Sequence, residues 1–424
     1  MLLLIKNGTV INPGDQTQAE ADVLVEDGMI KKIGAALPVK AERVIDAAGC
    51  YVMPGFIDMH VHLRDPGQEH KETVETGLRA AVHGGFTTIV AMPNTKPIVD
   101  NPDVVRYVHN KAQDIGLAHV LQAGAMTRGE RGEELSDIEG MVEAGIPALS
   151  EDGKSVMNAQ LCREAMTLAM KYDIPVLAHC EDRNLVNGGV VNEDGNAQRL
   201  GLKGIANSVE DVIAARDMIL ARETGAALHL CHCSTKGSVQ MLRFAKQVGL
   251  RVTAEVCPHH FTLTSSDIPE DDANYKMNPP LRTQEDVDAL KEGLRDGAID
   301  VIATDHAPHT AIEKGEGLKH APFGIAGLET VASLVMTELV EPGYLTMMQM
   351  AEKMSYNPAK ILGLDRGVAE EGKPADLVVF DPQREYVINP ADFYSKGKNT
   401  PFAGRKVRGM VMATVVDGRV VYER

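Results

Sequence analysis

The sequence predicts an α/β fold: a TIM-like (β/α)8 barrel with a small β-sandwich domain formed by both chain termini. Three observations lead to this prediction. The 424 residues exceed the usual length of one domain, so a barrel with an addition is expected. The middle of the chain alternates short apolar runs with amphipathic stretches eight times. Both ends of the chain show the alternating pattern of short β-strands.

Strand-like alternation at the two ends covers residues 2–11, 22–33, 376–387 and 405–423. Turn dipeptides such as Asn7-Gly8 and Asp417-Gly418 separate the strands. Neither end supplies enough strands to be stable alone. We therefore expect residues 1–54 and 366–424 to pair into one composite β-domain, and residues 55–365 to form a catalytic barrel.

The expected barrel strands are the apolar runs at 55–62, 87–94, 120–127, 147–152, 175–181, 227–234, 252–260 and 301–306. Helical periodicity separates them at 72–83, 102–114, 135–144, 159–172, 208–224, 237–248, 284–296 and 327–340. Nearly continuous apolar composition is typical of parallel strands that are buried on both faces. An open doubly wound sheet is the alternative, but no G-x-G-x-x-G turn follows the first strand.

Composition excludes several classes of protein. Lys and Arg number 43 against 60 Asp and Glu, a net charge of −17, whereas nucleic-acid binding requires a basic surface. No apolar stretch approaches the roughly 18 residues of a membrane span. Only five apolar residues precede Lys6, too few for a secretory signal. The six cysteines show no CxxC spacing, so we expect reduced thiols in a cytoplasmic protein without nucleic-acid or membrane partners.

Residue types that bind metals stand at the ends of five predicted strands: His60, His62, Asp152, His179, His232 and Asp305. The carboxyl ends of barrel strands converge on one mouth, so these side chains can meet. His60 and His62 are two residues apart and point to the same face of a strand. Imidazole and carboxylate ligands suit zinc and its neighbours, although ligand type does not fix the metal.

Six protein ligands exceed what one open catalytic zinc ion needs, which is usually three plus a water. Two ions that share a bridging carboxylate and a bridging hydroxide would use all six. The sequence therefore predicts a hydrolytic centre with two metal ions at the mouth of the barrel.

Three longer motifs carry a family resemblance. The segment Asp58-Met59-His60-Val61-His62-Leu63-Arg64-Asp65-Pro66-Gly67 resembles the metal motif of dihydroorotases in the amidohydrolase superfamily. The segments 92–95 (MPNT) and 303–309 (ATDHAPH) match the same family. The likeness covers essentially the whole chain and is greatest for the bacterial type I enzymes.

This resemblance implies a reversible reaction of pyrimidine (UMP) biosynthesis, its third de novo step: N-carbamoyl-L-aspartate closes to (S)-dihydroorotate with loss of water. It implies two Zn²⁺ per chain, one on His60 and His62 and the other on His179 and His232. Asp152 would bridge the ions, and Asp305 would bind the first ion and act as catalytic acid and base. The implied substrate contacts are His62, Leu63, Arg64, Asn94, Asn278, His309, Phe323 and Gly324.

Chemistry read from the residues agrees with this activity. In the hydrolytic direction, a hydroxide bridging the metals would attack the ring amide carbonyl, and Asp305 would transfer its proton to the leaving nitrogen. The planar guanidinium of Arg64 matches a carboxylate, which dihydroorotate carries.

Several alternatives stay open at this stage. Glu151 precedes Asp152 where the family often has a second aspartate, so Glu151 is the alternative bridge; Lys154 is too far along the loop to be a carboxylated lysine. His259 and His260 are expected to pack or to support the site from behind. Residues 310–322 form either a lid or an ordinary surface loop. Allantoinase and dihydropyrimidinase are the nearest rival activities, and a non-catalytic scaffold for aspartate transcarbamoylase is the rival from another class. The family expectation is a homodimer with possible association with aspartate transcarbamoylase.

Overall fold

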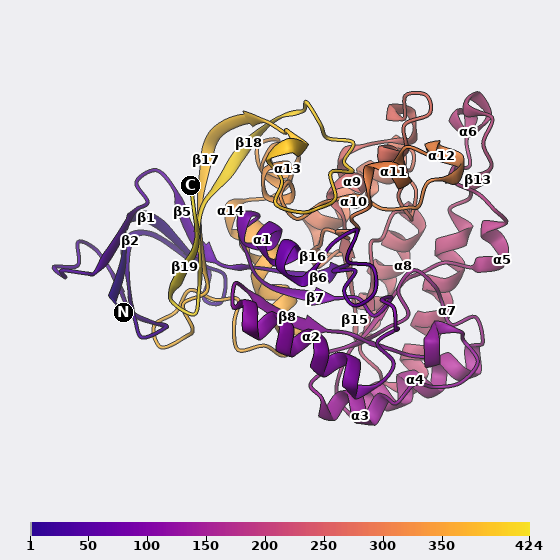
Figure 1. Cartoon of the computed structure of the whole chain (residues 1–424), viewed down its shortest axis with the longest axis horizontal. Helices are drawn as coiled ribbons and strands as arrows, with labels where there is room; N and C mark the ends of the chain where they lie inside the picture. The colour runs from indigo at the N-terminus through magenta and orange to yellow at the C-terminus, as the bar shows by residue number, and fades with distance from the viewer. Residues whose placement is uncertain (1) are drawn as a thin grey trace.

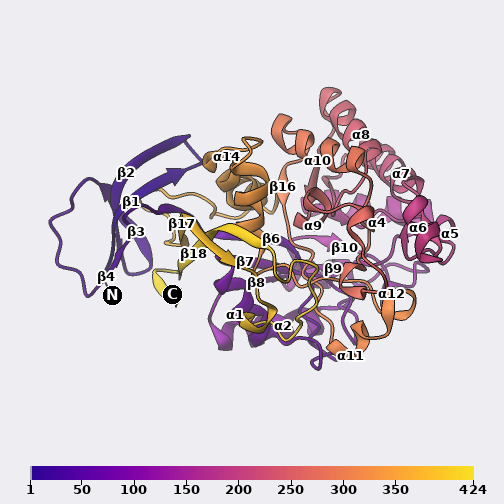
Figure 2. The same ribbon diagram turned by 90° about the horizontal axis from the view of Figure 1, so that it is seen from above.

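The structure, a computed structural model, describes residues 2–424; Met1 of the expected β-domain lies outside the described residues. A barrel surrounded by helices occupies one side of the molecule, and a large sheet carrying both chain ends occupies the other (Figure 1). The view from above shows the same division, with strands β1 to β4 farthest from the barrel (Figure 2). The predicted fold class is confirmed.

The barrel consists of parallel strands in the predicted order. They are β6 (Phe56–Val61), β7 (Phe86–Ala91), β8 (His119–Gln122), β9 (Gly124–Ala125), β10 (Leu149–Ser150), β11 (Val176–Ala178), β14 (Leu228–Leu230), β15 (Val252–Val256) and β16 (Val301–Ile302). Strands β8 and β9 are two parts of the third strand, interrupted at Ala123. The barrel closes between the first and eighth strands, where the His62 backbone N donates to the His306 carbonyl at 2.8 Å.

The seventh strand is shorter than predicted. Its run was expected to extend over residues 252–260, but β15 ends at Val256 and a short helix, α9 (Pro258–Thr262), follows. Pro258 occupies the first turn of α9, where a proline costs no backbone hydrogen bond and fixes a helical φ. His259 and His260 therefore lie on a helix and not on a strand.

The eight predicted barrel helices are present. They are α1 (Val74–His83), α2 (Pro102–Ile115), α3 (Ile138–Glu143), α4 (Ala159–Lys171), α7 (Ser208–Thr224), α8 (Lys236–Gln247), α10 (Gln284–Asp296) and α13 (Val331–Val335), which a π-helical turn (Met336–Val340) continues. Polar side chains begin several of them: Asn101 caps α2 and Thr235 caps α8 by accepting backbone N–H groups. Gly225 ends α7 with φ of 75°, a conformation that suits glycine.

Shorter elements fill the connections. They are α5 (Arg183–Val186), β12 (Val191–Asn192), α6 (Gly195–Leu200), β13 (Gly204–Ile205), α11 (Ala311–Lys314), α12 (Gly317–His320), α14 (Met347–Ala351), α15 (Asn357–Ile361), a π-helical turn (Glu352–Tyr356) and 3-10 turns at Arg128–Glu130, Ser265–Asp267, Ala273–Tyr275 and Pro390–Asp392. Residues 310–322, the possible lid, thus contain the two short helices α11 and α12.

The strands from both termini form a single sheet with the order β19-β18-β17-β5-β1-β2-β3, and β4 pairs with β1. They are β1 (Leu2–Asn12), β2 (Thr17–Glu26), β3 (Met29–Gly34), β4 (Arg43–Asp46), β5 (Tyr51–Pro54), β17 (Leu377–Val387), β18 (Lys406–Val416) and β19 (Arg419–Glu423). The two ends meet where β5 pairs antiparallel with β17, Val52 opposite Val379. The expected pairing of the termini is confirmed, and the exact domain boundaries stay a prediction.

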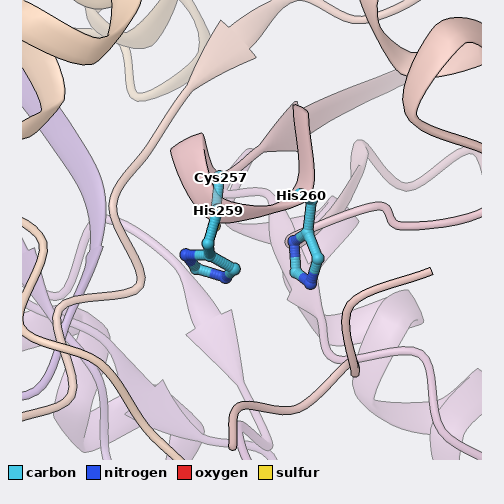
Figure 3. Close-up of side chains that lie close together, drawn as sticks. All are labelled: Cys257, His259 and His260. Carbon is cyan, nitrogen blue, oxygen red and sulfur yellow. The ribbon is translucent and has the colours of Figure 1, made fainter. Parts of the chain in front are cut away.

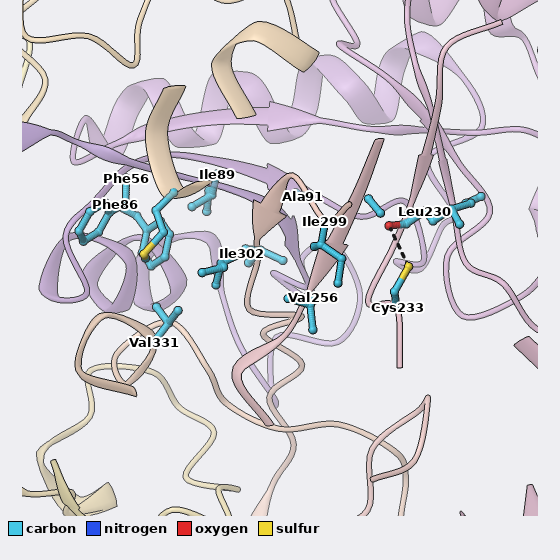
Figure 4. Packing of buried hydrophobic residues seen from close by; sticks show 14 of the residues in the cluster. Phe56, Phe86, Ile89, Ala91, Leu230, Cys233, Val256, Ile299, Ile302 and Val331 are labelled. Atoms are coloured by element: carbon cyan, nitrogen blue, oxygen red, sulfur yellow. Dashed lines mark hydrogen bonds between the residues drawn. The ribbon is translucent and has the colours of Figure 1, made fainter. Parts of the chain in front are cut away.

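Apolar packing joins these parts. The main core lies between the barrel strands and their helices. In it the rings of Phe56 and Phe86 pack edge to face, with their centroids 5.8 Å apart, beside Ile302 and Val331 (Figure 4). A second cluster, with Ile57, Leu177 and Val301, fills the interior of the barrel. The six cysteines of the described chain are free thiols. Among residues 2–424, no helix is long and apolar enough to cross a membrane.

Candidate metal centre and active site

The six predicted metal ligands meet at the carboxyl ends of the barrel strands, around the carboxylate of Asp152. Its Oδ1 lies 3.0 Å from His60 Nε2, 3.6 Å from His179 Nδ1 and 3.7 Å from His232 Nε2. Its Oδ2 lies 3.3 Å from His62 Nε2. Asp152 is thus the acid next to which all four imidazoles converge.

Asp305 completes the cluster from the eighth strand. Its Oδ1 lies 3.1 Å from His62 Nε2 and 3.6 Å from His60 Nε2. The atoms of His60, His62 and Asp305 lie within 4.8 Å of one another, and so do those of His60, Asp152 and His232. These two sets of three ligand atoms overlap at His60, and either set could hold a metal ion.

The chemistry of this cluster fits metal binding better than a hydrogen-bonded core. All six side chains are buried, yet His60 Nε2 and Asp152 Oδ1 have no hydrogen-bond partner. His179 Nδ1 and His232 Nε2 lie 2.9 Å apart, both directed at the same carboxylate. Buried polar atoms without partners are costly, and a cation would satisfy these. The residues present therefore suit a bound metal ion.

Electrostatics tie the acids and imidazoles together. Burial lowers the pKa of His60, but the adjacent Asp152 carboxylate outweighs it and holds this pKa well above its usual range. Burial raises the pKa of Asp152, but His60 and the other imidazoles hold it well below its usual range. Burial raises the pKa of Asp305, but its hydrogen bond to His62 and the charges of His60, His62 and His232 together outweigh burial and lower this pKa. Both carboxylates are therefore ionised at neutral pH, the form that binds a metal or accepts a proton.

The backbone is strained at three positions in the site. Arg64, His232 and Asp305 have φ values of 60°, 32° and 48°, in a region that residues with a side chain seldom adopt. Such conformations cost of order 1–3 kcal/mol each and concentrate at functional sites. Here they turn three polar side chains at the strand ends toward the mouth of the barrel.

A cavity of about 190 Å³ opens beside the cluster. It is lined by His62, Arg64, Asn94, Asp152, Gly153, His179, His232, Asn278, Asp305, Ala307, His309, Phe323 and Gly324. Seven of the eight predicted substrate contacts thus line one cavity. Leu63 does not, because its side chain is buried in the main core against Gly77.

Arg64 and His309 lie together at one side of this cavity. Arg64 Nη2 lies 3.3 Å from His309 Nε2, and Arg64 Nε donates to the Pro308 carbonyl at 3.4 Å. His309 Nε2 also donates to the Phe323 carbonyl at 2.9 Å. Gly324 follows with φ of 144°, and a Cβ there would lie 2.6 Å from the Ala307 carbonyl oxygen. The Gly324 position thus requires glycine, which leaves backbone exposed to a ligand.

The neighbours of Asp152 separate the alternatives for the bridging position. Glu151 points away from the cluster and accepts from the backbone N and hydroxyl of Thr127. Lys154 Nζ donates to the Glu130 carbonyl at 3.1 Å. Asn94, a predicted substrate contact, bonds to two predicted metal ligands. Its Oδ1 accepts from His62 Nδ1 at 2.9 Å, and its Nδ2 donates to Asp152 Oδ2 at 3.3 Å. Of the two acids, Asp152 faces the four imidazoles and Glu151 does not.

Comparisons with known proteins agree with this geometry. A family model described as dihydro-orotase-like matches residues 49–238. A dihydroorotase of Pelotomaculum thermopropionicum is 51% identical over 100% of this chain and 99% of that protein. A dihydroorotase of Thermoanaerobacter sp. (strain X514) is 49% identical over 100% of this chain and 98% of that protein. The chain belongs to the dihydroorotase family.

Solved structures place this member of the dihydroorotase family among cyclic-amide hydrolases. An L-hydantoinase (dihydropyrimidinase) from Arthrobacter aurescens aligns with a TM-score of 0.88 at 27% identity, covering 99% of this chain and 96% of that one. A D-hydantoinase aligns with a TM-score of 0.88 at 26% identity, covering 100% and 95%. Enzymes named for different cyclic amides thus share this barrel and sheet, so the fold alone does not determine the substrate.

One residue that contacts the cluster of this dihydroorotase-family member was not predicted from the sequence: Glu255, the last residue but one of β15. Its side chain is fully buried, and His60 Nδ1 donates to its Oε1 at 2.8 Å. His229 Nε2 donates to the other oxygen at 3.1 Å, and His229 Nδ1 lies 2.8 Å from the Thr253 hydroxyl. With its proton on Nδ1, His60 presents the lone pair of Nε2 to the cluster. The signal in the sequence is one carboxylate within a buried apolar strand.

Glu255→Gln is expected to weaken metal binding about 10- to 100-fold, because an outer carboxylate that holds a ligand imidazole contributes about that much. The glutamine keeps the size of the side chain but can present an N–H to His60. Competition with a chromogenic chelator measures the affinity. Glu285→Gln, on the exposed surface of α10, is the control and should leave affinity unchanged. Equal affinity in the Glu255 variant and the unmodified chain would contradict a holding role.

A second group of ligand-type residues lies on the turn after β15. Cys257, His259 and His260 offer atoms within 4.8 Å of one another, all in buried side chains (Figure 3). His260 Nε2 donates to the Pro279 carbonyl at 2.9 Å. Burial lowers the pKa of His259 to about 4, so its ring is neutral. The expectation that these histidines pack behind the site agrees with this placement.

Proposed function

We propose that this chain catalyses the reversible cyclisation of N-carbamoyl-L-aspartate to (S)-dihydroorotate, with loss of water, using two Zn²⁺ per chain. Membership of the dihydroorotase family supports this activity in pyrimidine biosynthesis. The observation that carries the proposal is the cavity in which three imidazoles and two carboxylates of the cluster face the Arg64–His309 pair. One end of the cavity fits an amide to be hydrolysed and the other fits a carboxylate.

The proposed ligands are His60 and His62 for one ion and His179 and His232 for the other, with Asp152 between them and Asp305 beside the first. Zinc ions bound there supply a nucleophilic hydroxide at neutral pH and polarise a carbonyl oxygen. The chain's own residues hold these ligands in place: Glu255 fixes His60 and Asn94 fixes His62 through their Nδ1 atoms. Both rings therefore present Nε2 to the cluster.

Asp305 is the proposed general acid and base. Its carboxylate lines the cavity, 3.1 Å from His62 Nε2, and its lowered pKa keeps it ionised. In hydrolysis it would take a proton from the attacking water at its carboxylate oxygen and deliver it to the ring nitrogen as the amide C–N bond breaks. In cyclisation the same proton moves in the opposite direction.

Arg64 is the proposed anchor of the substrate carboxylate. Its side chain is buried, with few oxygen partners in the described structure, and its guanidinium can donate two parallel N–H groups to a carboxylate. Asn278 and the Phe323–Gly324 backbone form the remaining wall of the cavity. Allantoin and dihydrouracil lack this carboxylate, so the pair Arg64 and His309 favours dihydroorotate over both.

Other parts of the proposal follow from the family. We expect a cytoplasmic homodimer that can associate with aspartate transcarbamoylase. The alternative of a non-catalytic scaffold is disfavoured because all six ligand side chains are present and converge.

A substrate panel tests the proposed function. The zinc-loaded protein is expected to hydrolyse dihydroorotate at least about a hundredfold faster, in kcat/KM, than dihydrouracil or allantoin, since a site built around a charged group rejects analogues that lack it. The zinc content of the same preparation should be about two ions per chain. Faster turnover of allantoin or dihydrouracil would replace the proposed substrate, and absence of all three activities would restore the scaffold alternative.

A further inference from the structure

The chain between β17 and β18 leaves the terminal sheet and reaches the mouth of the barrel. In Figure 1 it is the yellow segment that extends from β18 toward the barrel helices. Ser395, Asn399 and Thr400 of this segment are buried, although it contains no helix or strand beyond one 3-10 turn. Gly397 lies so close to Pro308 that a Cβ would come within 2.5 Å of the Pro308 side chain. We call residues 395–400 the crossing segment.

Asn399 joins two loops that line the substrate cavity. Its Oδ1 accepts from the His309 backbone N at 2.9 Å. Its Nδ2 donates to the carbonyls of Ala307 at 3.1 Å and Gly324 at 3.0 Å. Its side chain is only 4% exposed, so these three bonds are sheltered from water. One amide thus connects the loop after β16 with the segment that carries Phe323 and Gly324.

Backbone bonds make part of the same connection. The Ala307 N donates to the Ile325 carbonyl, and the Ala326 N donates to the Asn399 carbonyl, both at 2.8 Å. Those two bonds join Ile325 to the loop after β16 and Ala326 to the crossing segment. Asn399 acts nearer the cavity, because Ala307, His309 and Gly324 all line it. The Asn399 side chain therefore fixes the His309 backbone relative to Gly324, together with the bond from His309 Nε2 to the Phe323 carbonyl.

The crossing segment also braces the layer beneath the site. The Ser395 hydroxyl and the Lys396 N donate to the Glu72 carboxylate, which lies 3.3 Å from His306 Nε2. His306 follows Asp305, and its carbonyl accepts from the His62 backbone N. Ser395 thus reaches the loop that carries Asp305 only through Glu72 and His306. Asn399 instead bonds directly to the His309 backbone, on the side of the cavity where Arg64 lies.

We propose that Asn399 is a positioning residue that sets the carboxylate-binding part of the cavity by fixing His309 and Gly324 relative to each other. This inference rests on the proposed function, since it assigns a substrate group to His309 and Arg64. Its effect is specific: substrate binding depends on Asn399, whereas the metal cluster does not, because no hydrogen bond described here joins Asn399 to a metal-ligating side chain.

Two variants test this role. Asn399→Asp keeps the shape of the side chain but replaces the amide donor by an acceptor that faces two carbonyls. Asn399→Ala removes all three hydrogen bonds without adding charge, and it is used if Asn399→Asp fails to fold. Asn389→Asp is the control, because Asn389 is exposed in the same connection and its Oδ1 can still accept from Ala391. Each zinc-loaded variant is compared for KM and kcat with dihydroorotate, for zinc content and for amide hydrogen exchange.

The expected result is a KM raised about tenfold or more, with kcat within about threefold and zinc content unchanged, as loss of buried hydrogen bonds implies. Amide exchange should accelerate in residues 307–310 and 323–326, and the control should behave like the unmodified chain. An unchanged KM, or a fall in kcat that accompanies loss of zinc, would overturn the inference. An unmodified chain that does not hydrolyse dihydroorotate would refute the proposed function, while faster exchange in the two loops would still show that Asn399 positions them.

Discussion

Asp305→Asn is expected to reduce kcat for dihydroorotate hydrolysis by about a thousandfold or more, since a general acid–base group contributes roughly 10²–10⁴. Asparagine preserves the size of the side chain and an oxygen near His62, but it cannot take up and release a proton. Excess Zn²⁺ should fill the site of the variant without restoring the rate. Rates are measured at saturating substrate, alongside zinc per chain.

The matched control is Asp296→Asn, at the exposed end of α10, where the carboxylate pairs with Arg243. Its kcat should equal that of the unmodified chain. If Asp305→Asn kept kcat within about tenfold of the unmodified chain, the proton would have to move through another group.

Asp152→Ala is expected to lower zinc content from about two ions per chain to one or none and to abolish measurable hydrolysis. This carboxylate approaches all four imidazoles within 3.7 Å or less, so its removal takes away the one ligand that both ions would share. It also removes the anion that balances these imidazoles when they are protonated. Metal analysis after dialysis gives the ion count.

Glu151→Gln separates the two candidates for the bridge. Glu151 contacts Thr127 and not the histidines, so this variant should retain about two ions and most of its activity. If Glu151→Gln lost metal and Asp152→Ala did not, Glu151 and not Asp152 would be the bridging carboxylate. A single ion that survives Asp152→Ala would require a mechanism with one metal.

Local sequence patterns were sufficient for most of the fold. Each barrel strand carried an apolar run, and several helices carried both a periodicity and caps, as for α2 with Asn101 and Gly116. The predicted seventh strand extends too far because Val256 and Cys257 prolong its apolar run, whereas Pro258 begins a helix. The interruption of the third strand at Ala123 has no comparable signal.

The convergence of the four imidazoles and two carboxylates was predictable for a geometric reason: strand ends of a barrel converge, so residue type and position were enough to bring His60 and Asp305 together. Glu255 and Asn399 were missed because their roles depend on partners far along the chain. Asn399 meets His309 only because the chain returns from β17 to the barrel, a path that composition does not reveal. Leu63 was carried over with its motif, and its side chain points to the core.

The pairing of β5 with β17 has a consequence for the order in which the protein is made. Synthesis proceeds from the N-terminus, so β1 to β5 and every barrel strand leave the ribosome before Leu377 begins β17. Until then the nascent chain exposes an unpaired strand edge at β5, which invites wrong pairing. Asn399 emerges later still, after all six residues of the metal cluster. The six side chains of the cluster can therefore come together in the growing chain before Asn399 is available to hold the His309 backbone and the Gly324 carbonyl.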